Sequence, residues 1–118
     1  MSSGVEYFIE RTEKRKKYFV KYKDYCRLIK KELTKKFGSV RVIVFGSTVR
    51  GDYNPALSDI DILVVTSRKL SSRERAAIIN FIRNKIIRDP EAPFEIHIAS
   101  EKEHREWYKK FIDKQIEI

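Results

Sequence analysis

The chain has 118 residues, 36% of them charged, with one cysteine and a net charge of +9. This length suggests a single domain, which can bury enough apolar surface to fold without a structural metal or disulfide. The lone Cys26 excludes an internal disulfide, and apolar runs of about five residues are far too short for a membrane helix. The N-terminus is charged and lacks an apolar signal core, so we expect a cytoplasmic protein with no membrane partner.

The positive charge is concentrated near the N-terminus. Residues 1–41 hold 13 Lys/Arg and 5 Asp/Glu, a balance of +8, whereas residues 42–118 hold 13 and 12. Such a segment could steer an anionic partner toward the protein. It could also be the solvated face of a helix in a charge-rich protein, which is the interpretation we favour.

The first predicted element is a long helix, or two, between about Val5 and Phe37, a stretch without proline or internal glycine. Gly38 is expected to end it. Apolar residues recur at spacings of three and four, or sums of these, which predicts one buried stripe: Phe8, Tyr18, Tyr22, Tyr25, Leu28, Ile29 and Leu33. The β-branched run 39–45 then predicts a strand.

Four more elements are expected after this strand. A second strand is predicted over 58–66, and a helix over 71–89 that opens with a capping box from Ser71 to Glu74. A third strand is predicted over 94–99, and a final amphipathic helix over 101–114. That helix should direct three aromatic residues inward: Trp107, Tyr108 and Phe111.

The element order is α-β-(α)-β-α-β-α, in which the bracketed helix is short. This order predicts an α/β (α+β) fold with a small mixed sheet packed with helices. We expect one domain, 1–118, with a basic N-terminal helical segment (1–37), a catalytic core (39–99) and the C-terminal helix (101–114).

The turn after the first strand is a candidate anion site. Gly46 and Ser47 leave the strand, and small residues there let the backbone approach a ligand closely. A following short helix would offer free N–H groups, with Ser47 and Thr48 hydroxyls as further donors. Arg50 could contact a phosphate or balance a carboxylate. A Gly-Ser pair alone also fits an ordinary strand-to-helix turn, and the segment lacks the Gly-Lys-Ser/Thr of a Walker A loop.

The second strand carries an unusual pair of acidic residues. Asp59 and Asp61 should project to one face while Ile60 and Ile62 enter the core. Two like charges so placed repel each other unless a cation lies between them, and carboxylate oxygens suit Mg²⁺ or Mn²⁺. A solvated strand edge is the alternative. A phosphate-binding turn, eleven residues, and then paired carboxylates together predict a site for a metal-bound nucleoside triphosphate.

These motifs resemble a known family. "FGSTVRG" followed by "SDIDILVV" is similar to the signature of the DNA polymerase β-like nucleotidyltransferase superfamily, and the short chain resembles its minimal nucleotidyltransferases of prokaryotes. The resemblance covers roughly residues 40–98. It implies transfer of a nucleoside monophosphate from an NTP to a hydroxyl, with release of pyrophosphate.

The resemblance also implies roles for individual residues. Gly46 and Ser47 would hold the triphosphate, and Asp59 and Asp61 would bind a divalent metal, Mg²⁺ or Mn²⁺. The family adds a third carboxylate on a later strand. Glu95 is our candidate, although that position is more often aspartate, and His97 on the same strand face is a possible neighbour or replacement.

The resemblance finally implies a partner. Similar short chains pair with a helical HEPN-type protein in toxin–antitoxin modules, in some cases transferring AMP from ATP to a tyrosine of that protein. Two alternatives stay open: a binding module that neutralises its partner by contact alone, and nucleotidyl transfer to an RNA end. Nucleic acid is thus a possible but less favoured partner.

Overall fold

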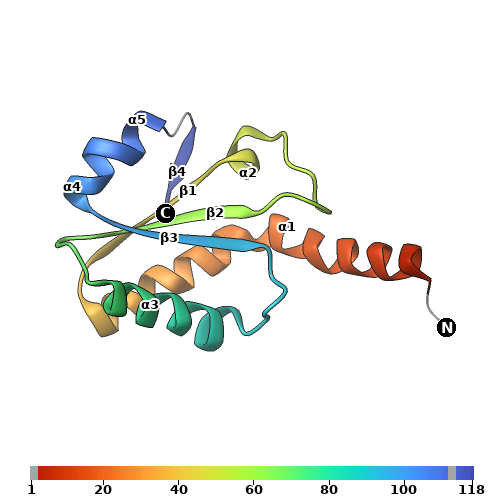
Figure 1. Cartoon of the computed structure of the whole chain (residues 1–118), viewed down its shortest axis with the longest axis horizontal. Helices are drawn as coiled ribbons and strands as arrows, with labels where there is room; N and C mark the ends of the chain where they lie inside the picture. The colour runs from red at the N-terminus through yellow and green to blue at the C-terminus, as the bar shows by residue number, and fades with distance from the viewer. Residues whose placement is uncertain (1–2, 112–113) are drawn as a thin grey trace.

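A computed structural model describes residues 3–111 and 114–118 (Figure 1). The helices and strands follow one another along the chain: α1 (Gly4–Phe37), β1 (Val40–Phe45), α2 (Ser47–Arg50), β2 (Ile60–Thr66), α3 (Ser72–Phe81), the π-helical segment η1 (Ile82–Ile87), β3 (Phe94–Ser100), α4 (Glu101–Glu103), the π-helical segment η2 (His104–Tyr108), α5 (Lys109–Phe111) and β4 (Gln115–Glu117). Within these residues no helix is both long and apolar enough to cross a membrane.

The predicted N-terminal helix is a single continuous element, α1. The Ser3 hydroxyl accepts a hydrogen bond from the N–H of Glu6 at its start, and Gly38 ends it with φ +89°. The buried stripe of α1 includes Tyr18, Cys26 and Leu33, packed against the sheet. Figure 1 shows that α1 lies beneath the sheet and extends well beyond it at its N-terminal end.

The strands form one four-stranded mixed sheet in the order β3-β2-β1-β4. β1 pairs antiparallel with β2 and with β4, whereas β2 and β3 are parallel, so the predicted mixed sheet is confirmed. The register places Asp61 opposite Phe45 on one side and Glu95 on the other.

Alternation along the strands separates the two faces of the sheet. Ile60 and Ile62 of β2 point to the face that α1, α3 and η1 cover, where most of the core lies. Leu63 and Val65 point to the opposite face, where a smaller cluster packs against Tyr108. Asp61 shares that second face, so the predicted division between core isoleucines and carboxylate is confirmed for β2.

The C-terminal segment differs from its prediction in two ways. Trp107 is 62% exposed, and His104 is buried instead. The wider turns of η2 explain this, since the predicted inward positions assumed α-helical spacing throughout. β4 was not predicted, yet its neighbour Ile118 packs on the core and donates its N–H to the carbonyl of Val42. The Phe111 side chain, and residues 112–113 of the predicted helix, lie outside what the structure describes.

Candidate active site

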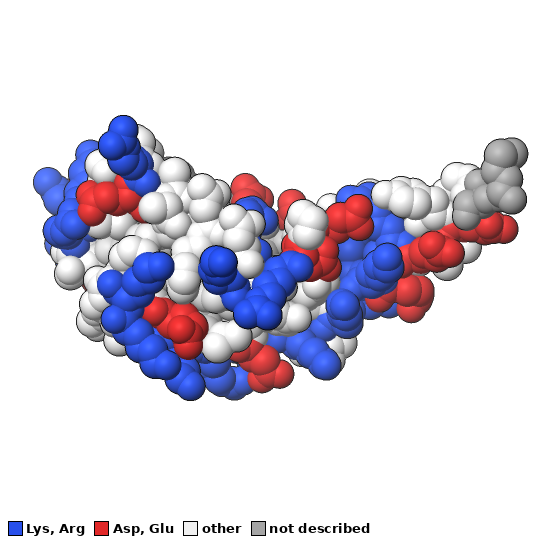
Figure 2. Space-filling view, turned by 90° about the horizontal axis from the view of Figure 1, so that it is seen from below, with Lys and Arg blue, Asp and Glu red and all other residues white. Residues whose placement is uncertain are grey.

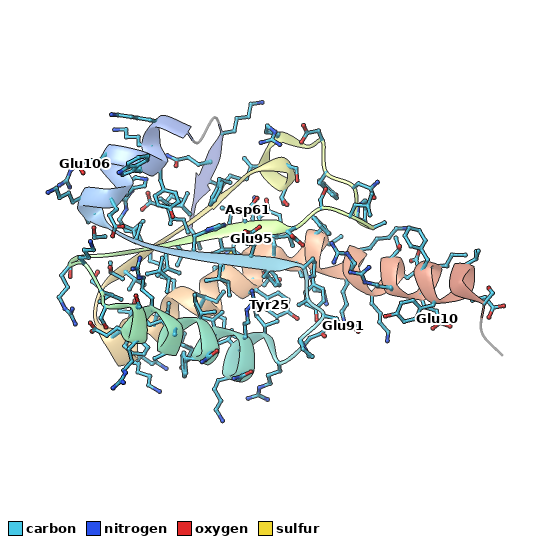
Figure 3. All side chains as sticks on the ribbon, viewed as in Figure 1. Glu10, Tyr25, Asp61, Glu91, Glu95 and Glu106 are labelled. Carbon is cyan, nitrogen blue, oxygen red and sulfur yellow. The ribbon has the colours of Figure 1, made fainter. Side chains whose placement is uncertain are left out.

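Two carboxylates and an imidazole converge on the second face of the sheet. Asp61 of β2 is the register partner of Glu95 on β3, and His97 lies two residues further along β3 on the same face. The His97 Nε2 is 3.5 Å from Asp61 Oδ1 and 3.6 Å from Glu95 Oε1. Figure 3 shows Asp61 and Glu95 together on the side of the sheet that faces away from Tyr25 of α1.

This arrangement couples the charges of the three groups. Asp61 raises the pKa of His97 above its usual value, partial burial opposes this, and the charge of Glu95 adds to the rise. The side chains of Asp61 and His97 are only 23% and 29% exposed, whereas Glu95 is 55% exposed. Two carboxylates this close repel each other, and a positive group placed between them would offset that repulsion.

Gly46 brings the turn after β1 against this cluster. Its φ is +81°, a conformation that residues with a side chain rarely adopt. A Cβ placed on Gly46 would lie 2.3 Å from Asp61 Oδ2. The backbone of the turn therefore touches the carboxylate, and only glycine allows both the bend and this close approach.

The other residues of the turn form the short helix α2, with Gly46 at its N-cap and Ser47 as its first residue. Thr48 is buried, and its Oγ1 has no hydrogen-bond partner among the described residues. Arg50 is half-exposed, and its Nε lies 3.4 Å from Asp52. Arg50 is thus held by a neighbouring carboxylate, and not by any carboxylate of the cluster.

Asp59 lies apart from the other predicted ligands. It precedes β2, which begins at Ile60, and its side chain is 53% exposed. Its Oδ1 lies 3.7 Å from Arg15 of α1. The described donor atoms that gather within 4.8 Å of one another come from Asp61, Glu95 and His97, without Asp59.

The functional residues predicted from the sequence did not include Arg15. Its side chain is 7% exposed, and its guanidinium donates hydrogen bonds to the carbonyl oxygens of Pro55 and Ser58. It fastens the loop between α2 and β2 to α1, next to Asp59. A charged residue on the predicted buried stripe was the available signal, since an interior arginine needs partners.

The cluster fits a divalent cation. Carboxylate oxygens suit Mg²⁺ and Mn²⁺, and an imidazole nitrogen is a further ligand that Mn²⁺ and other transition metals accept. Among the described residues, the buried Nε2 of His97 has no hydrogen-bond partner within bonding geometry. The carboxylate oxygens beside it are Asp61 Oδ1 at 3.5 Å and Glu95 Oε1 at 3.6 Å. Nε2 is therefore available to a ligand placed between Asp61 and Glu95.

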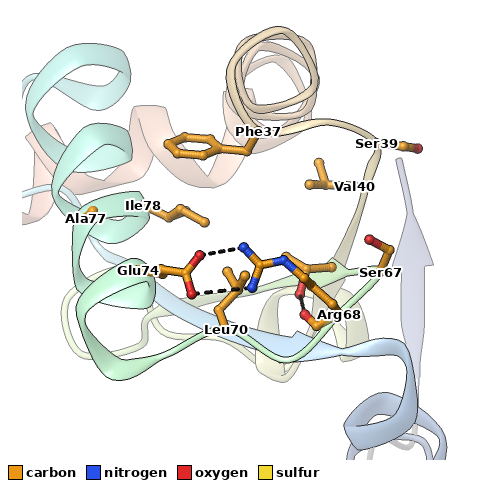
Figure 4. A pocket seen from close by; sticks show the side chains of 10 residues that line it. Phe37, Ser39, Val40, Ser67, Arg68, Leu70, Glu74, Ala77 and Ile78 are labelled. Carbon is orange, nitrogen blue, oxygen red and sulfur yellow. Dashed lines mark hydrogen bonds and ion pairs between the residues drawn. The ribbon is translucent and has the colours of Figure 1, made fainter.

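A separate pocket lies at the opposite end of β1 and β2. Its walls include Phe37, Leu70 and Ile78, and the ion pair between Arg68 and Glu74 crosses it (Figure 4). The walls are largely apolar and share no residue with the carboxylate cluster. This pocket is therefore a poor candidate for phosphate or metal chemistry.

Comparison with known proteins agrees with this geometry. Residues 26–116 match the profile of a family described as "Nucleotidyltransferase domain". One similar structure, "Crystal structure of putative nucleotidyltransferase", has a TM-score of 0.61 and 28% identity, and the match covers 83% of this chain and 98% of that chain. No curated protein matches this chain significantly.

A second similar structure is described as "a putative nucleotidyltransferase from Sulfolobus solfataricus". It has a TM-score of 0.52 and 24% identity, covers 99% of this chain and 89% of that chain, and supports the fold. The family profile spans most of the chain. The chain therefore belongs to the nucleotidyltransferase domain family, as a minimal nucleotidyltransferase of the kind that its two motifs predicted.

Proposed function

We propose that this nucleotidyltransferase transfers AMP from ATP to a hydroxyl group of a partner protein. The observation that carries this proposal is the convergence of Asp61, Glu95 and His97 beside the turn at Gly46. Phosphoryl chemistry of this kind needs positioned charge more than it needs a covalent nucleophile. The cluster supplies charge on one side, and the turn offers backbone N–H groups on the other.

Each residue has a role in the proposal. Gly46 and Ser47 approach the triphosphate with their backbone, while Asp61, Glu95 and Asp59 would hold Mg²⁺ or Mn²⁺. A divalent cation bound there neutralises phosphate charge and lowers the pKa of a coordinated hydroxyl. Arg15 keeps Asp59 and its loop in place against α1.

The proposed reaction is an in-line displacement at the α-phosphorus. The acceptor oxygen forms a bond to that phosphorus, while the bond to the bridging oxygen breaks and pyrophosphate leaves with the electron pair. Glu95 takes the proton of the acceptor hydroxyl, because its carboxylate is the most exposed group of the cluster. His97 orients Asp61 and Glu95 by contacting both.

The partner we propose is a helical HEPN-type protein, with a tyrosine hydroxyl as acceptor. The described residues form the sheet and its covering helices. In this proposal the acceptor tyrosine is presented by the partner protein. The family resemblance of the two motifs supports this choice of partner.

Labelled ATP tests the proposal and identifies the acceptor. The protein and the helical product of a neighbouring gene are incubated with Mg²⁺ and ATP labelled at either the α- or the γ-phosphate. We expect α-label on the partner protein and no γ-label. γ-Label on protein would contradict nucleotidyl transfer, and α-label on RNA alone would move the acceptor to an RNA end.

Matched variants make the result specific to the site. Asp61→Asn removes a carboxylate from the cluster with little change of shape. Glu91→Gln makes the same kind of change at an exposed position away from the cluster, as Figure 3 shows. We expect the first to abolish transfer and the second to retain it. A tight complex without any label would favour neutralisation by contact.

A further inference from the structure

The two carboxylates of the cluster differ from other acidic side chains of the protein in their partners. The chain holds 26 Lys/Arg and 17 Asp/Glu, so basic side chains are in excess. Acidic and basic side chains are interspersed on the face formed by α1 and α3 (Figure 2), and Glu74 pairs with Arg68. Among the described residues, however, the ion-pair partner of Asp61 and Glu95 is His97, and neither carboxylate pairs with a Lys or Arg. The cluster therefore concentrates negative charge that the basic side chains of the chain do not offset.

His97 directs one ring nitrogen toward these carboxylates. Its Nε2 is buried and has no hydrogen-bond partner within the described part of the chain, and it lies 3.5 Å from Asp61 Oδ1 and 3.6 Å from Glu95 Oε1. Two aromatic rings flank the imidazole, with centroids 5.5 Å away for Phe45 and 6.5 Å away for Tyr108. A buried polar atom without a hydrogen bond is costly, so a ligand that engages Nε2 would remove that cost.

The spacing of the three donor atoms suits a metal ion. Ligands at about 2.0–2.2 Å from an ion, with octahedral or tetrahedral angles, lie roughly 3.0–3.5 Å from one another. The two distances from His97 Nε2, 3.5 and 3.6 Å, are already close to this spacing. One donor atom from each of the three residues lies within 4.8 Å of the other two. A rotation of the exposed Glu95 side chain would therefore be enough to close the set around an ion.

The neighbours of the two aspartates decide which of their oxygens can join the set. A Cβ on Gly46 would lie 2.3 Å from Asp61 Oδ2, so that oxygen lies against the turn, whereas Asp61 Oδ1 lies beside His97. Asp59 Oδ1 lies 3.7 Å from Arg15, and Asp59 is not among the described residues whose donor atoms gather within 4.8 Å. The set therefore consists of two carboxylates and one imidazole, and not of three carboxylates.

The imidazole nitrogen determines which ions the set favours. Mg²⁺ prefers oxygen ligands and usually keeps several of its waters, so it gains little from an imidazole. Transition ions such as Mn²⁺ and Zn²⁺ accept both carboxylate and imidazole ligands, and Zn²⁺ binds such sites more tightly than Mn²⁺ does. A set made only of carboxylates would accept Mg²⁺ and Mn²⁺ alike. The presence of His97 therefore predicts discrimination between Mg²⁺ and the transition ions.

We propose that Asp61, Glu95 and His97 form a transition-metal site, which binds Mn²⁺ or Zn²⁺ without nucleotide and prefers these ions to Mg²⁺. His97 is a direct ligand through Nε2, and the contacts by which it orients the two carboxylates also aim this nitrogen at the ion. This inference rests on the proposed function for what the ion does during catalysis. Metal binding itself needs neither ATP nor a partner protein, so it can be measured separately.

Titration with Mn²⁺ in the absence of nucleotide tests the proposal. The electron paramagnetic resonance signal of free Mn²⁺ gives its dissociation constant, and added Mg²⁺ shows how well Mg²⁺ competes. We expect the wild type to bind Mn²⁺ more tightly than Mg²⁺, on the order of 10-fold or more. His97→Gln replaces the imidazole nitrogen by an amide group. It should weaken Mn²⁺ binding roughly 10–100-fold, since even the loss of an outer-shell partner costs that much, and should leave Mg²⁺ binding nearly unchanged. Glu91→Gln, which changes an exposed carboxylate away from the cluster, is the control and should bind both ions as the wild type does.

Nitrogen-15 spectra of the wild type identify the ligand atom without relying on a variant. The chain has two histidines, His97 and His104, so long-range proton–nitrogen spectra can follow each ring. One equivalent of Zn²⁺ should shift Nε2 of His97 and leave Nε2 of His104 in place. An unshifted His97, equal losses of Mn²⁺ and Mg²⁺ affinity in His97→Gln, or no Mn²⁺ binding without nucleotide would overturn the inference.

The same measurements separate this inference from the proposed function. Binding of Mn²⁺ through His97 in a protein that transfers no AMP would refute the proposed function alone. Transfer of AMP with Mg²⁺, in a protein whose His97 does not bind metal, would overturn the metal preference alone.

Discussion

Replacing Gly46 by alanine probes the contact between the turn and the carboxylate cluster. The added Cβ would lie 2.3 Å from Asp61 Oδ2, and the alanine would have to adopt φ +81°. With ψ at −158°, Gly46 lies in a region of φ and ψ that is essentially restricted to glycine, which costs an alanine about 1–3 kcal/mol. Moving the Asp61 side chain off its preferred rotamer adds about 1 kcal/mol. We expect Gly46→Ala to lower the free energy of unfolding by about 2–4 kcal/mol, measured by urea titration.

Gly51→Ala is the matched control. Gly51 has φ +87°, but nothing among the described residues lies within 4 Å of the point that its Cβ would occupy. This variant should show the backbone cost of about 1–2 kcal/mol alone. Only Gly46→Ala should also weaken Mn²⁺ binding, by roughly 10-fold, which corresponds to about 1.4 kcal/mol. Equal stability and equal Mn²⁺ affinity of the two variants would refute the inferred contact.

Three further predictions concern residues outside the cluster. Arg15→Met should lower the free energy of unfolding by about 3 kcal/mol in urea, because two loop carbonyls lose a buried charged donor; the exposed Arg11→Met should change it little, and equal effects would contradict this role. Burial raises the pKa of the Cys26 thiol to about 12. It should therefore resist thiol reagents until the protein unfolds, and rapid labelling of the native protein would count against the packing. The hydrogen bond from Arg68 holds the pKa of Glu74 at about 2, below its ordinary 4.5, so its stabilising effect is present above pH 4.5 and is lost as the pH falls toward 2. Glu74→Gln should flatten the dependence of melting temperature on pH in that interval, and an unchanged profile would argue against the ion pair.

The sequence was sufficient to predict the elements that carry the cluster. Alternation in "SDIDILVV" and "FEIHIA" places Asp61 and Glu95 on one face of their strands, and the structure brings these strands together in parallel register. The capping box of α3, from Ser71 to Glu74, is likewise present. These features depend on local periodicity and on side chains near one another in sequence, which a single chain reveals.

Features that depend on long-range packing escaped prediction. Arg15 contacts a loop some 40 residues away, so its role appears only once α1 lies beneath that loop. β4 is three residues long, too short for a clear periodic signal, and is defined by its pairing with β1. Trp107 is exposed where α-helical spacing predicts an inward side chain, because η2 departs from that spacing.

Titration calorimetry with ATP is the most direct test of the claim that the Asp61 cluster is a metal-dependent nucleotide site. ATP is titrated into wild-type protein with Mn²⁺ and again with EDTA, and into Asp61→Asn and Glu91→Gln with Mn²⁺. We predict binding by the wild type and by Glu91→Gln only when the metal is present, and a loss of at least 10-fold in affinity for Asp61→Asn. Equal ATP affinity with Mn²⁺ and with EDTA, or full affinity in Asp61→Asn, would contradict the account.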